Sequence, residues 1–164
     1  MKQVNDTTDY IVVGGGASGC ALTSKLLQSN NKVSLFESGY SHRNFLLDIP
    51  AGFFKLINDS KYMTYHKTLP QEHLGGRENI IPQGHVLGGG TSVNAQVYMR
   101  GRPQDYNEWD SILRFNNDTV SWAWDTLLPY FKNMENNSRL DNEFHGKFGP
   151  LMVSDSSHID QLTK

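Results

Sequence analysis

The sequence predicts an α/β fold whose first part is a strand–helix–strand unit with parallel strands. Three observations support this prediction. An apolar, β-branched run at Tyr10–Val13 stops at a glycine triplet, the residues after the glycines repeat apolar side chains at helical spacing, and a second apolar run ends on an acid, Glu37. A chain of 164 residues has the length of one ordinary domain or of a piece of a larger one.

The three elements of this unit follow one another closely. Tyr10–Val13 is expected to be a buried strand, because a short β-branched run that ends at glycine is typical of one. The helix is expected over Ala17–Gln28, where four apolar side chains lie on one helical face. Lys32 to Glu37 ("KVSLFE") is the second expected strand. A right-handed crossover makes the strands parallel, which gives a Rossmann-like βαβ unit of the FAD/NAD(P)-binding type.

The rest of the chain predicts fewer regular elements. Residues 40–80 are broken by proline and glycine and are expected to be mostly irregular. Pro103 is placed to begin a short helix. Asp125 is expected to be the N-cap of a second helix that reaches Met134, and Leu151–Val153 is expected to be a short strand.

The first glycine run fits the pattern G-x-G-x-x-G between a strand and a helix, which is the context that the pattern requires. Gly14 makes the tight turn, Gly16 lets a pyrophosphate approach the backbone, and Gly19 lets helix and strand pack closely. The N–H groups around Ala17 and Ser18 open the helix and present partial positive charge to phosphates. This run therefore predicts a dinucleotide site.

Glu37 supports the same site from the end of the second strand. It lies roughly 20 residues beyond the glycines, where an acid can accept hydrogen bonds from the adenosine ribose. A carboxylate there repels a 2′-phosphate, which argues against NADP. The alternative is a glycine turn without a ligand and a solvated acid. The βαβ unit by itself does not distinguish NAD from FAD.

A second glycine run, Gly88, Gly89 and Gly90, distinguishes the two cofactors. Consecutive glycines let the main chain lie beside a flat ring system and aim N–H donors at its edge. Asn94 is expected on the first turn after the run, where its amide can bond the polar rim of a flavin or fix the loop. The alternative is a structural glycine turn that Asn94 caps. A short NAD-dependent dehydrogenase would leave the second run unexplained.

Composition excludes several classes of protein. A net charge of -2 gives no electrostatic reason to expect a nucleic-acid partner. The single cysteine, Cys20, rules out an internal disulfide, and its expected role is helix packing. The first nine residues are polar, and no apolar run reaches the roughly 18 residues of a transmembrane helix. We expect a cytoplasmic protein without a transmembrane segment, and we predict no metal site.

Five stretches, in order along nearly the whole chain, resemble the amino-terminal part of the glucose–methanol–choline (GMC) oxidoreductases, and in particular their choline dehydrogenase-like branch. They are "DYIVVGGGASGCALTSKL", "FESG", "GHVLGGGTSVNAQVYMRGRPQDYNEW", "WDTLLPYFKNME" and "HGKFGPLMVSD". The third is the most specific, because it resembles the signature of this family around its flavin.

The resemblance implies FAD as the cofactor and assigns roles by position. The residues implied to hold its pyrophosphate are Gly14, Gly16, Ala17, Ser18 and Gly19, with Glu37 on the adenosine ribose. The residues implied to line the isoalloxazine are Gly90, Asn94, Ala95 and Val97, while Leu87, Gly88 and Gly89 shape the loop that leads to it. One position departs from the family: His85 stands where Arg or Lys is usual, either as a cationic side chain or as a solvated loop histidine.

The resemblance also divides the chain. Residues 1–110 would be the amino-terminal part of an FAD-binding domain, with the βαβ unit at 9–39 and the flavin loop at 84–107. Residues 111–164 would begin a substrate domain. Only two strands of a parallel sheet are recognisable, and such sheets need further strands and two covered faces. We therefore expect an incomplete domain and a fragment of a longer protein.

Family members oxidise an alcohol by hydride transfer to flavin N5, with a histidine near their carboxyl end that handles the hydroxyl proton. No histidine here lies in a matching motif, so no catalytic base is assigned, and His145 in "HGKFGP" is interpreted as a loop residue. The implied partners are a small alcohol and an acceptor, either oxygen or a quinone-type compound. The rival hypothesis is a non-catalytic, truncated dinucleotide-binding remnant.

Overall fold

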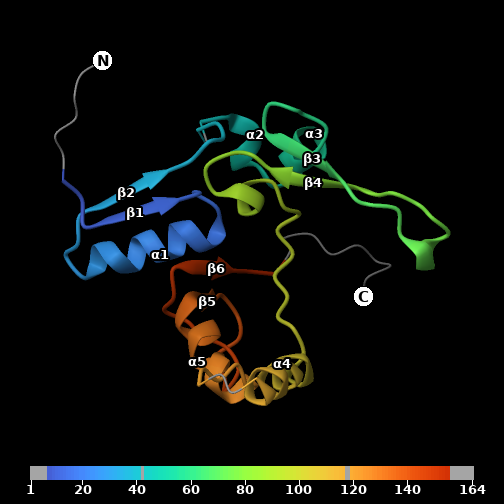
Figure 1. Cartoon of the computed structure of the whole chain (residues 1–164). Helices are drawn as coiled ribbons and strands as arrows, with labels where there is room; N and C mark the ends of the chain where they lie inside the picture. Colours follow the sequence, from blue (N-terminus) through green and yellow to red (C-terminus); the bar gives the residue numbers. More distant parts are fainter. Residues whose placement is uncertain (1–6, 42, 117–118, 156–164) are drawn as a thin grey trace. The chain divides into compact units, whose positions relative to one another are not determined.

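The computed structural model describes residues 7–41, 43–116 and 119–155. The chain divides into two compact units, Met1–Val97 and Tyr98–Lys164, and each is described by itself. Figure 1 labels the helices and strands of both units. In the described part of the chain, no helix combines the length and the apolar character that a membrane crossing requires.

The first unit begins with the predicted βαβ unit. Strand β1 (Tyr10–Val13) leads through the glycine turn into helix α1 (Ala17–Gln28), and strand β2 (Val33–Phe36) returns parallel to β1. The prediction of both strands and of the helix is confirmed, and β2 is one residue shorter at each end than predicted. The helix ends at Gln28, Asn30 follows with a positive φ of 59°, and the side-chain amide of Asn31 donates to the Leu26 carbonyl oxygen in the last turn over 3.0 Å.

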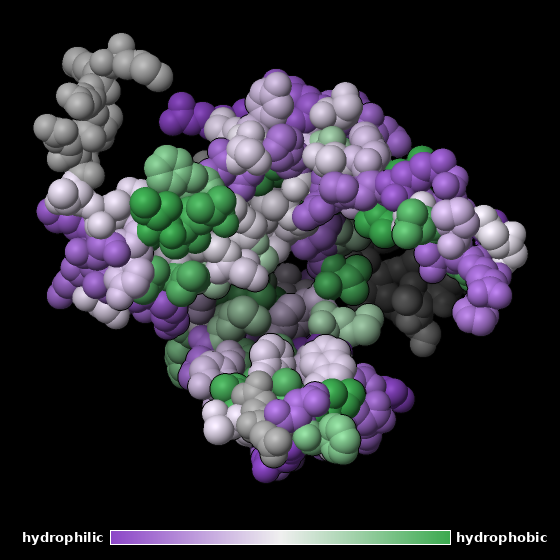
Figure 2. Space-filling view, in the orientation of Figure 1, coloured by the Kyte–Doolittle hydropathy of each residue, from purple (hydrophilic) through white to green (hydrophobic). Residues whose placement is uncertain are grey.

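This two-stranded sheet is covered by α1 on one face. Val12 faces the helix and is buried. Val13 and Phe36 are register partners and so share the opposite face, where they are 85% and 60% exposed. Figure 2 shows hydrophobic surface over these strands. Parallel sheets are normally buried on both faces, so the described residues provide only part of the cover that this sheet requires.

Between the βαβ unit and the second glycine run, the chain is more regular than predicted. It forms three short helical turns, α2 (Phe45–Asp48), η1 (Pro50–Gly52) and α3 (Phe53–Leu56), and then strand β3 (Met63–Lys67), turn η2 (Glu72–Leu74) and strand β4 (Ile80–Gly84). β3 and β4 pair antiparallel and project as an arm (Figure 1). The prediction of a mostly irregular segment is wrong here, because nearly every residue of these strands is exposed and no apolar alternation marks them.

The core of the first unit lies where this segment meets the second glycine run. Its members are all less than one-tenth exposed: Leu56, Tyr62, Met63, Val86 and Val93. Val86 lies two residues before Gly88, so the core holds the start of the second glycine run in place.

The second unit consists of helices α4 (Pro103–Phe115) and α5 (Trp124–Met134) and the short parallel pair β5 (Glu135–Asn137) and β6 (Leu151–Val153). Pro103 begins α4 and Leu151–Val153 forms a strand, as predicted. The helices pack through Tyr106, whose ring centroid lies 5.4 to 5.7 Å from three other aromatic rings, those of Trp109, Trp124 and Phe131.

The predicted N-cap of α5 is wrong. The cap is Ala123, and Asp125 lies inside the first turn. Side chains of α4 instead bond the backbone at this end: Asn107 accepts from the N–H of Trp124, the first helical residue, over 3.0 Å, and Asp110 accepts from the N–H of Trp122, just before the cap, over 2.8 Å. Because distant residues satisfy these donors, the local sequence does not reveal where the helix begins.

Candidate functional site

The first glycine turn has the geometry that its three glycines predict. Gly14 has a φ of +95°, which favours glycine, and its N–H donates to the Phe36 carbonyl oxygen over 2.7 Å. A Cβ on Gly19 would clash with the Gly14 carbonyl oxygen. A Cβ on Gly16 would meet nothing within 4 Å. Gly14 and Gly19 are thus required by the fold, whereas Gly16 leaves an open face.

That open face lies at the amino-terminal end of α1. Gly16 is the N-cap and makes no side-chain cap, and Ala17 and Ser18, the first two helical residues, are exposed. The early N–H groups of a helix lack intrahelical partners and carry partial positive charge. This end of α1 can therefore bind an anionic group such as a phosphate.

Glu37 lies directly after β2 and joins two backbone segments. Its Oε1 accepts the Gly39 N–H over 2.7 Å, and its Oε2 accepts the Gly15 N–H over 2.6 Å. These bonds, from Gly39 first and then Gly15, lower the pKa of Glu37 against the opposing effect of partial burial, with a smaller contribution from the charge of His85. The carboxylate is thus ionised and fixed beside the first glycine turn.

The second glycine run lies directly against the first. The Leu87 N–H donates to the Tyr40 carbonyl oxygen over 2.9 Å, and the Gly88 N–H donates to the Gly15 carbonyl oxygen over 2.6 Å. A Cβ on Gly89 would lie 2.9 Å from the Cα of Gly16. We call the place where Gly14–Gly16, Glu37–Tyr40 and His85–Gly90 meet the glycine junction.

Beyond the junction, the chain turns and becomes exposed. Gly88 and Gly89 have positive φ angles of 95° and 56°, and the turn η3 (Gly89–Ser92) follows. A Cβ on Gly90 would meet nothing within 4 Å. Asn94 comes two residues after the turn, where its Oδ1 accepts the Gln96 N–H over 2.9 Å. The three predicted residues of this stretch, Asn94, Ala95 and Val97, are all exposed.

The structure thus brings most of the predicted residues together. The junction holds Gly14, Gly16, Glu37, Leu87, Gly88, Gly89 and Gly90, with Ala17, Ser18 and Gly19 beginning α1 beside it. Sequence reasoning missed Gly39, although a glycine directly after the strand-end acid is a usable signal. It also missed Ser92, whose hydroxyl donates to the Leu87 carbonyl oxygen over 2.8 Å.

The junction fits a dinucleotide on its own geometry. Two glycine faces, at Gly16 and Gly90, are open where a side chain would otherwise stand. A helix amino-terminal end and a fixed carboxylate lie beside them. These groups can bind phosphates and accept hydroxyl hydrogen bonds, and none of them is a general base suited to an alcohol.

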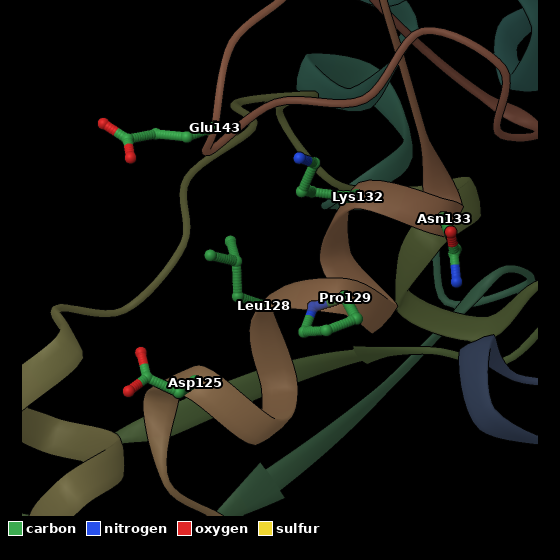
Figure 3. A pocket seen from close by; sticks show the side chains of 6 residues that line it. All are labelled: Asp125, Leu128, Pro129, Lys132, Asn133 and Glu143. Carbon is green, nitrogen blue, oxygen red and sulfur yellow. The ribbon is translucent and has the colours of Figure 1, made fainter.

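The second unit contains concave surface of a different kind. A pocket of about 350 Å³ is lined by Asp125, Leu128, Pro129, Lys132, Asn133 and Glu143. Figure 3 shows its charged side chains spread apart, and in the described part of the chain no hydrogen bond or ion pair joins them. This pocket has no convergent polar groups and is not a candidate site.

A buried carboxylate, Glu135, organises the second unit. It is fully buried and ion-paired with Arg100, and it accepts from the Asn137 side chain over 2.8 Å. His145 Nδ1 lies 2.9 Å from Glu135 Oε1. Burial raises the pKa of Glu135, but hydrogen bonds from Asn137, His145 and the Gly146 N–H, with the charge of Arg100, outweigh it and lower the pKa below its ordinary value. His145 is thus engaged in a structural cluster.

Comparison with known proteins connects these observations to a family. The sequence model of the family described as GMC oxidoreductase matches residues 8–162. An alcohol dehydrogenase [acceptor] of Pseudomonas putida is 38% identical over 158 residues, which is 95% of this chain and 28% of that protein. An oxygen-dependent choline dehydrogenase of Photobacterium profundum is 34% identical over 96% of this chain and 27% of its own length.

Solved structures agree with the sequence relatives. Pyridoxine 4-oxidase from Mesorbium loti is 31% identical, with a TM-score of 0.76, over 89% of this chain and 28% of that chain. A formate oxidase of Aspergillus oryzae RIB40, from work on the effect of a mutation on FAD modification, is 26% identical, with a TM-score of 0.72, over 93% of this chain and 27% of that one.

The expected α/β fold and the resemblance to the choline dehydrogenase-like branch are both confirmed. The chain spans little more than a quarter of the length of these relatives. Since the family match covers nearly all of its residues, the chain belongs to the GMC oxidoreductase family.

Proposed function

We propose that this chain holds FAD at the glycine junction for an oxidoreductase that acts on the CH–OH group of a small alcohol. The observation that carries the proposal is the 2.6 Å hydrogen bond from the Gly88 N–H to the Gly15 carbonyl oxygen. It joins a phosphate-binding turn to a second run of glycines whose open face suits a flat ring. One long cofactor with a pyrophosphate and a flavin would use both.

The proposed roles follow the positions of the residues around the junction. The pyrophosphate would be bound by Gly14, Gly16, Ala17, Ser18 and Gly19 at the start of α1, and the adenosine ribose by Glu37. The isoalloxazine would lie along Gly90, Asn94, Ala95 and Val97, and Leu87, Gly88 and Gly89 would shape the loop that leads to it. The exposure of Asn94, Ala95 and Val97 after η3 supports this second assignment, because a ligand can reach them.

FAD, when bound, would supply the hydride acceptor of the reaction. The chain's own contribution is binding and orientation: α1 directs partial positive charge at the phosphates, and the ionised Glu37 accepts hydroxyl hydrogen bonds. We assign no catalytic base, because no histidine of this chain lies in a motif that matches the one carrying the base in the family. The acceptor of the electrons, oxygen or a quinone-type compound, stays open.

Two further proposals concern organisation and location. We propose that residues 1–110 belong to the FAD-binding domain and residues 111–164 to the beginning of a substrate domain, a division that keeps the flavin loop 84–107 whole. The compact units themselves divide between Val97 and Tyr98. We also propose a cytoplasmic location, which the lack of any possible internal disulfide in a chain with one cysteine supports.

The test is to purify residues 1–164 under native conditions and to measure the flavin that denaturation releases. We expect FAD at one equivalent per chain. A folded chain without flavin, which also does not bind added FAD, would contradict the proposal. Alcohol-dependent reduction of a dye acceptor is measured in the same sample, because turnover by this chain alone would exclude the non-catalytic remnant as an alternative.

A further inference from the structure

His85 is the first residue of the His85–Gly90 segment of the glycine junction, and it contacts the Glu37–Tyr40 segment. Its backbone N–H donates to the Tyr62 carbonyl oxygen over 2.7 Å, and its carbonyl oxygen accepts the Tyr40 N–H over 3.2 Å. Both main-chain groups are thus held in place, beside the fully buried Val86. The fixed backbone directs the imidazole to a defined position.

The imidazole lies against the hydroxyl of Ser38. His85 Nε2 lies 3.0 Å from Ser38 Oγ. Ser38 stands between Glu37, the proposed ribose acid, and Gly39, whose N–H donates to Glu37 Oε1. The imidazole thus contacts the turn that provides one of the two hydrogen bonds fixing the carboxylate, and the bond from the Tyr40 N–H to the His85 carbonyl oxygen ties the same turn to the same residue.

The second hydrogen bond to Glu37 comes from the opposite side. The Gly15 N–H donates to Glu37 Oε2, and the Gly15 carbonyl oxygen accepts the Gly88 N–H. Gly88 lies three residues after His85. The segment from His85 to Gly88 thus reaches Glu37 by two routes, through Ser38 and Gly39 on one side and through Gly15 on the other.

We propose that His85 is a positioning residue for the adenosine end of the site: its bond to the Ser38 hydroxyl fixes the Ser38–Gly39 turn and so orients the Glu37 carboxylate toward the ribose. The inference rests on the proposed FAD site. It gives a role to the histidine that stands where Arg or Lys is usual, at the start of a loop whose glycines serve the flavin end.

The binding test uses ADP and FAD titrated by calorimetry into the 164-residue chain. His85→Ala is expected to weaken both ligands by the same factor, about tenfold, which is the size of one net hydrogen bond. Gln places a side-chain N–H near the position of Nε2, so His85→Gln is expected to restore most of the affinity. His73→Ala, on the exposed turn η2, is the matched control and should bind like the wild type.

Two binding results would overturn the inference. If His85→Ala weakens FAD and leaves ADP unchanged, the imidazole acts on the flavin end. If His85→Gln weakens the binding of ADP and FAD as much as His85→Ala does, the hydrogen bond to Ser38 is not the cause of the weaker binding. Ser38→Ala removes the same bond from an exposed partner and should reproduce the loss, even where His85→Ala folds poorly.

A ligand-free measurement separates this inference from the proposed function. The Gly15 and Gly39 N–H groups donate to a carboxylate, and NMR detects their amide protons directly. In His85→Gln and in His73→Ala both resonances should stay near their wild-type positions, whereas in His85→Ala the Gly39 resonance should move. An unmoved Gly39 resonance in a folded His85→Ala variant would overturn the positioning role. Failure of the wild-type chain to bind either ADP or FAD would instead contradict the proposed function.

Discussion

Two carboxylates, one in each unit, are held in different ways. Glu37 is half-buried and receives two backbone N–H groups. Glu135 is fully buried and is surrounded by the side chains of Arg100, Asn137 and His145. The pKa of each lies below its ordinary value. A lowered pKa therefore occurs both at a candidate binding site and in a structural cluster.

The difference lies in what remains free. Backbone donors bind the two oxygens of Glu37 from the protein side and leave part of the group exposed, so a ligand hydroxyl can still reach it. Three side chains and the Gly146 N–H enclose Glu135 and leave it inaccessible. A carboxylate that is fixed in position and still accessible to a ligand indicates a binding site, whereas a carboxylate that is fully enclosed indicates a contribution to folding stability. Five substitutions test this distinction, in order of decreasing effect.

The largest effect is expected for Glu135→Gln. Removing the charge leaves Arg100, whose side chain is 11% exposed, without its buried partner, and such a loss costs about 3–5 kcal/mol of the free energy of unfolding. Chemical denaturation measures it. The control is Arg139→Gln, which breaks the exposed pair with Asp155 and should change the midpoint far less. Equal shifts in the two variants would contradict the structural role of Glu135.

The glycines of the first turn should respond in opposite ways. In Gly19→Ala the new Cβ meets the Gly14 carbonyl oxygen, and overpacking of this kind costs about 1–3 kcal/mol of folding free energy. In Gly16→Ala the new Cβ enters open space, so folding stability should hold while FAD affinity falls by about tenfold or more. Gly16→Ala with wild-type affinity for FAD would show that no phosphate approaches this face.

Glu37→Gln should weaken the binding of FAD without unfolding the chain. The amide loses a charge-assisted hydrogen bond to the ribose, which corresponds to about a tenfold to hundredfold loss of affinity. The N–H₂ group of the new amide would also face the N–H of Gly15 or Gly39, which donates to the carboxylate in the wild type, so one of these two hydrogen bonds is lost. Titration with FAD and a thermal melt of the same sample separate the two effects. Unchanged affinity in a folded variant would exclude Glu37 from the site.

Substitution of Asp110 should have the smallest effect. It is also the most specific test, because Asp110 has a low pKa but is not part of the proposed binding site. A hydrogen bond from Arg114, then one from Ser121, and the Trp122 N–H lower the pKa of Asp110 from 3.8 to about 2 against the effect of burial. Its contribution to stability is therefore complete above about pH 4 and is lost as the pH falls through 2.

Asp110→Asn should flatten the loss of stability between these pH values and leave FAD affinity unchanged. Denaturation midpoints measured at intervals from pH 5 to pH 2 provide the comparison. Parallel pH profiles for the wild type and the variant would contradict the assignment, and so would a loss of FAD binding.

Local patterns predicted the elements that depend on local interactions. The βαβ unit was found because β1, α1 and β2 each carry their own apolar pattern, and the turn between β1 and α1 needs glycine at defined positions. The β3–β4 arm was missed because residues exposed on both sides show no alternation. The start of α5 was misplaced because the backbone N–H groups there are bonded by Asn107 and Asp110, which lie on α4 and not beside them in the sequence.

The two glycine runs of the candidate site could be predicted from the sequence, but the contact between them could not. Each glycine run was recognised from its own sequence. Their contact is made by main-chain atoms of Gly15 and Gly88, which carry no side-chain signal. The bond between Ser38 and His85 also joins residues far apart in the chain, and only the fold brings them together.

If the two glycine runs bind the two ends of one cofactor, NMR of the ¹⁵N-labelled chain will show which ligand reaches which run. ADP should shift the backbone amide resonances of Gly16 and Ala17 and leave that of Gly90 in place, whereas FAD should shift all three. FAD that shifts only the resonances at the start of α1 would show that the second run binds no flavin and would contradict the proposed function.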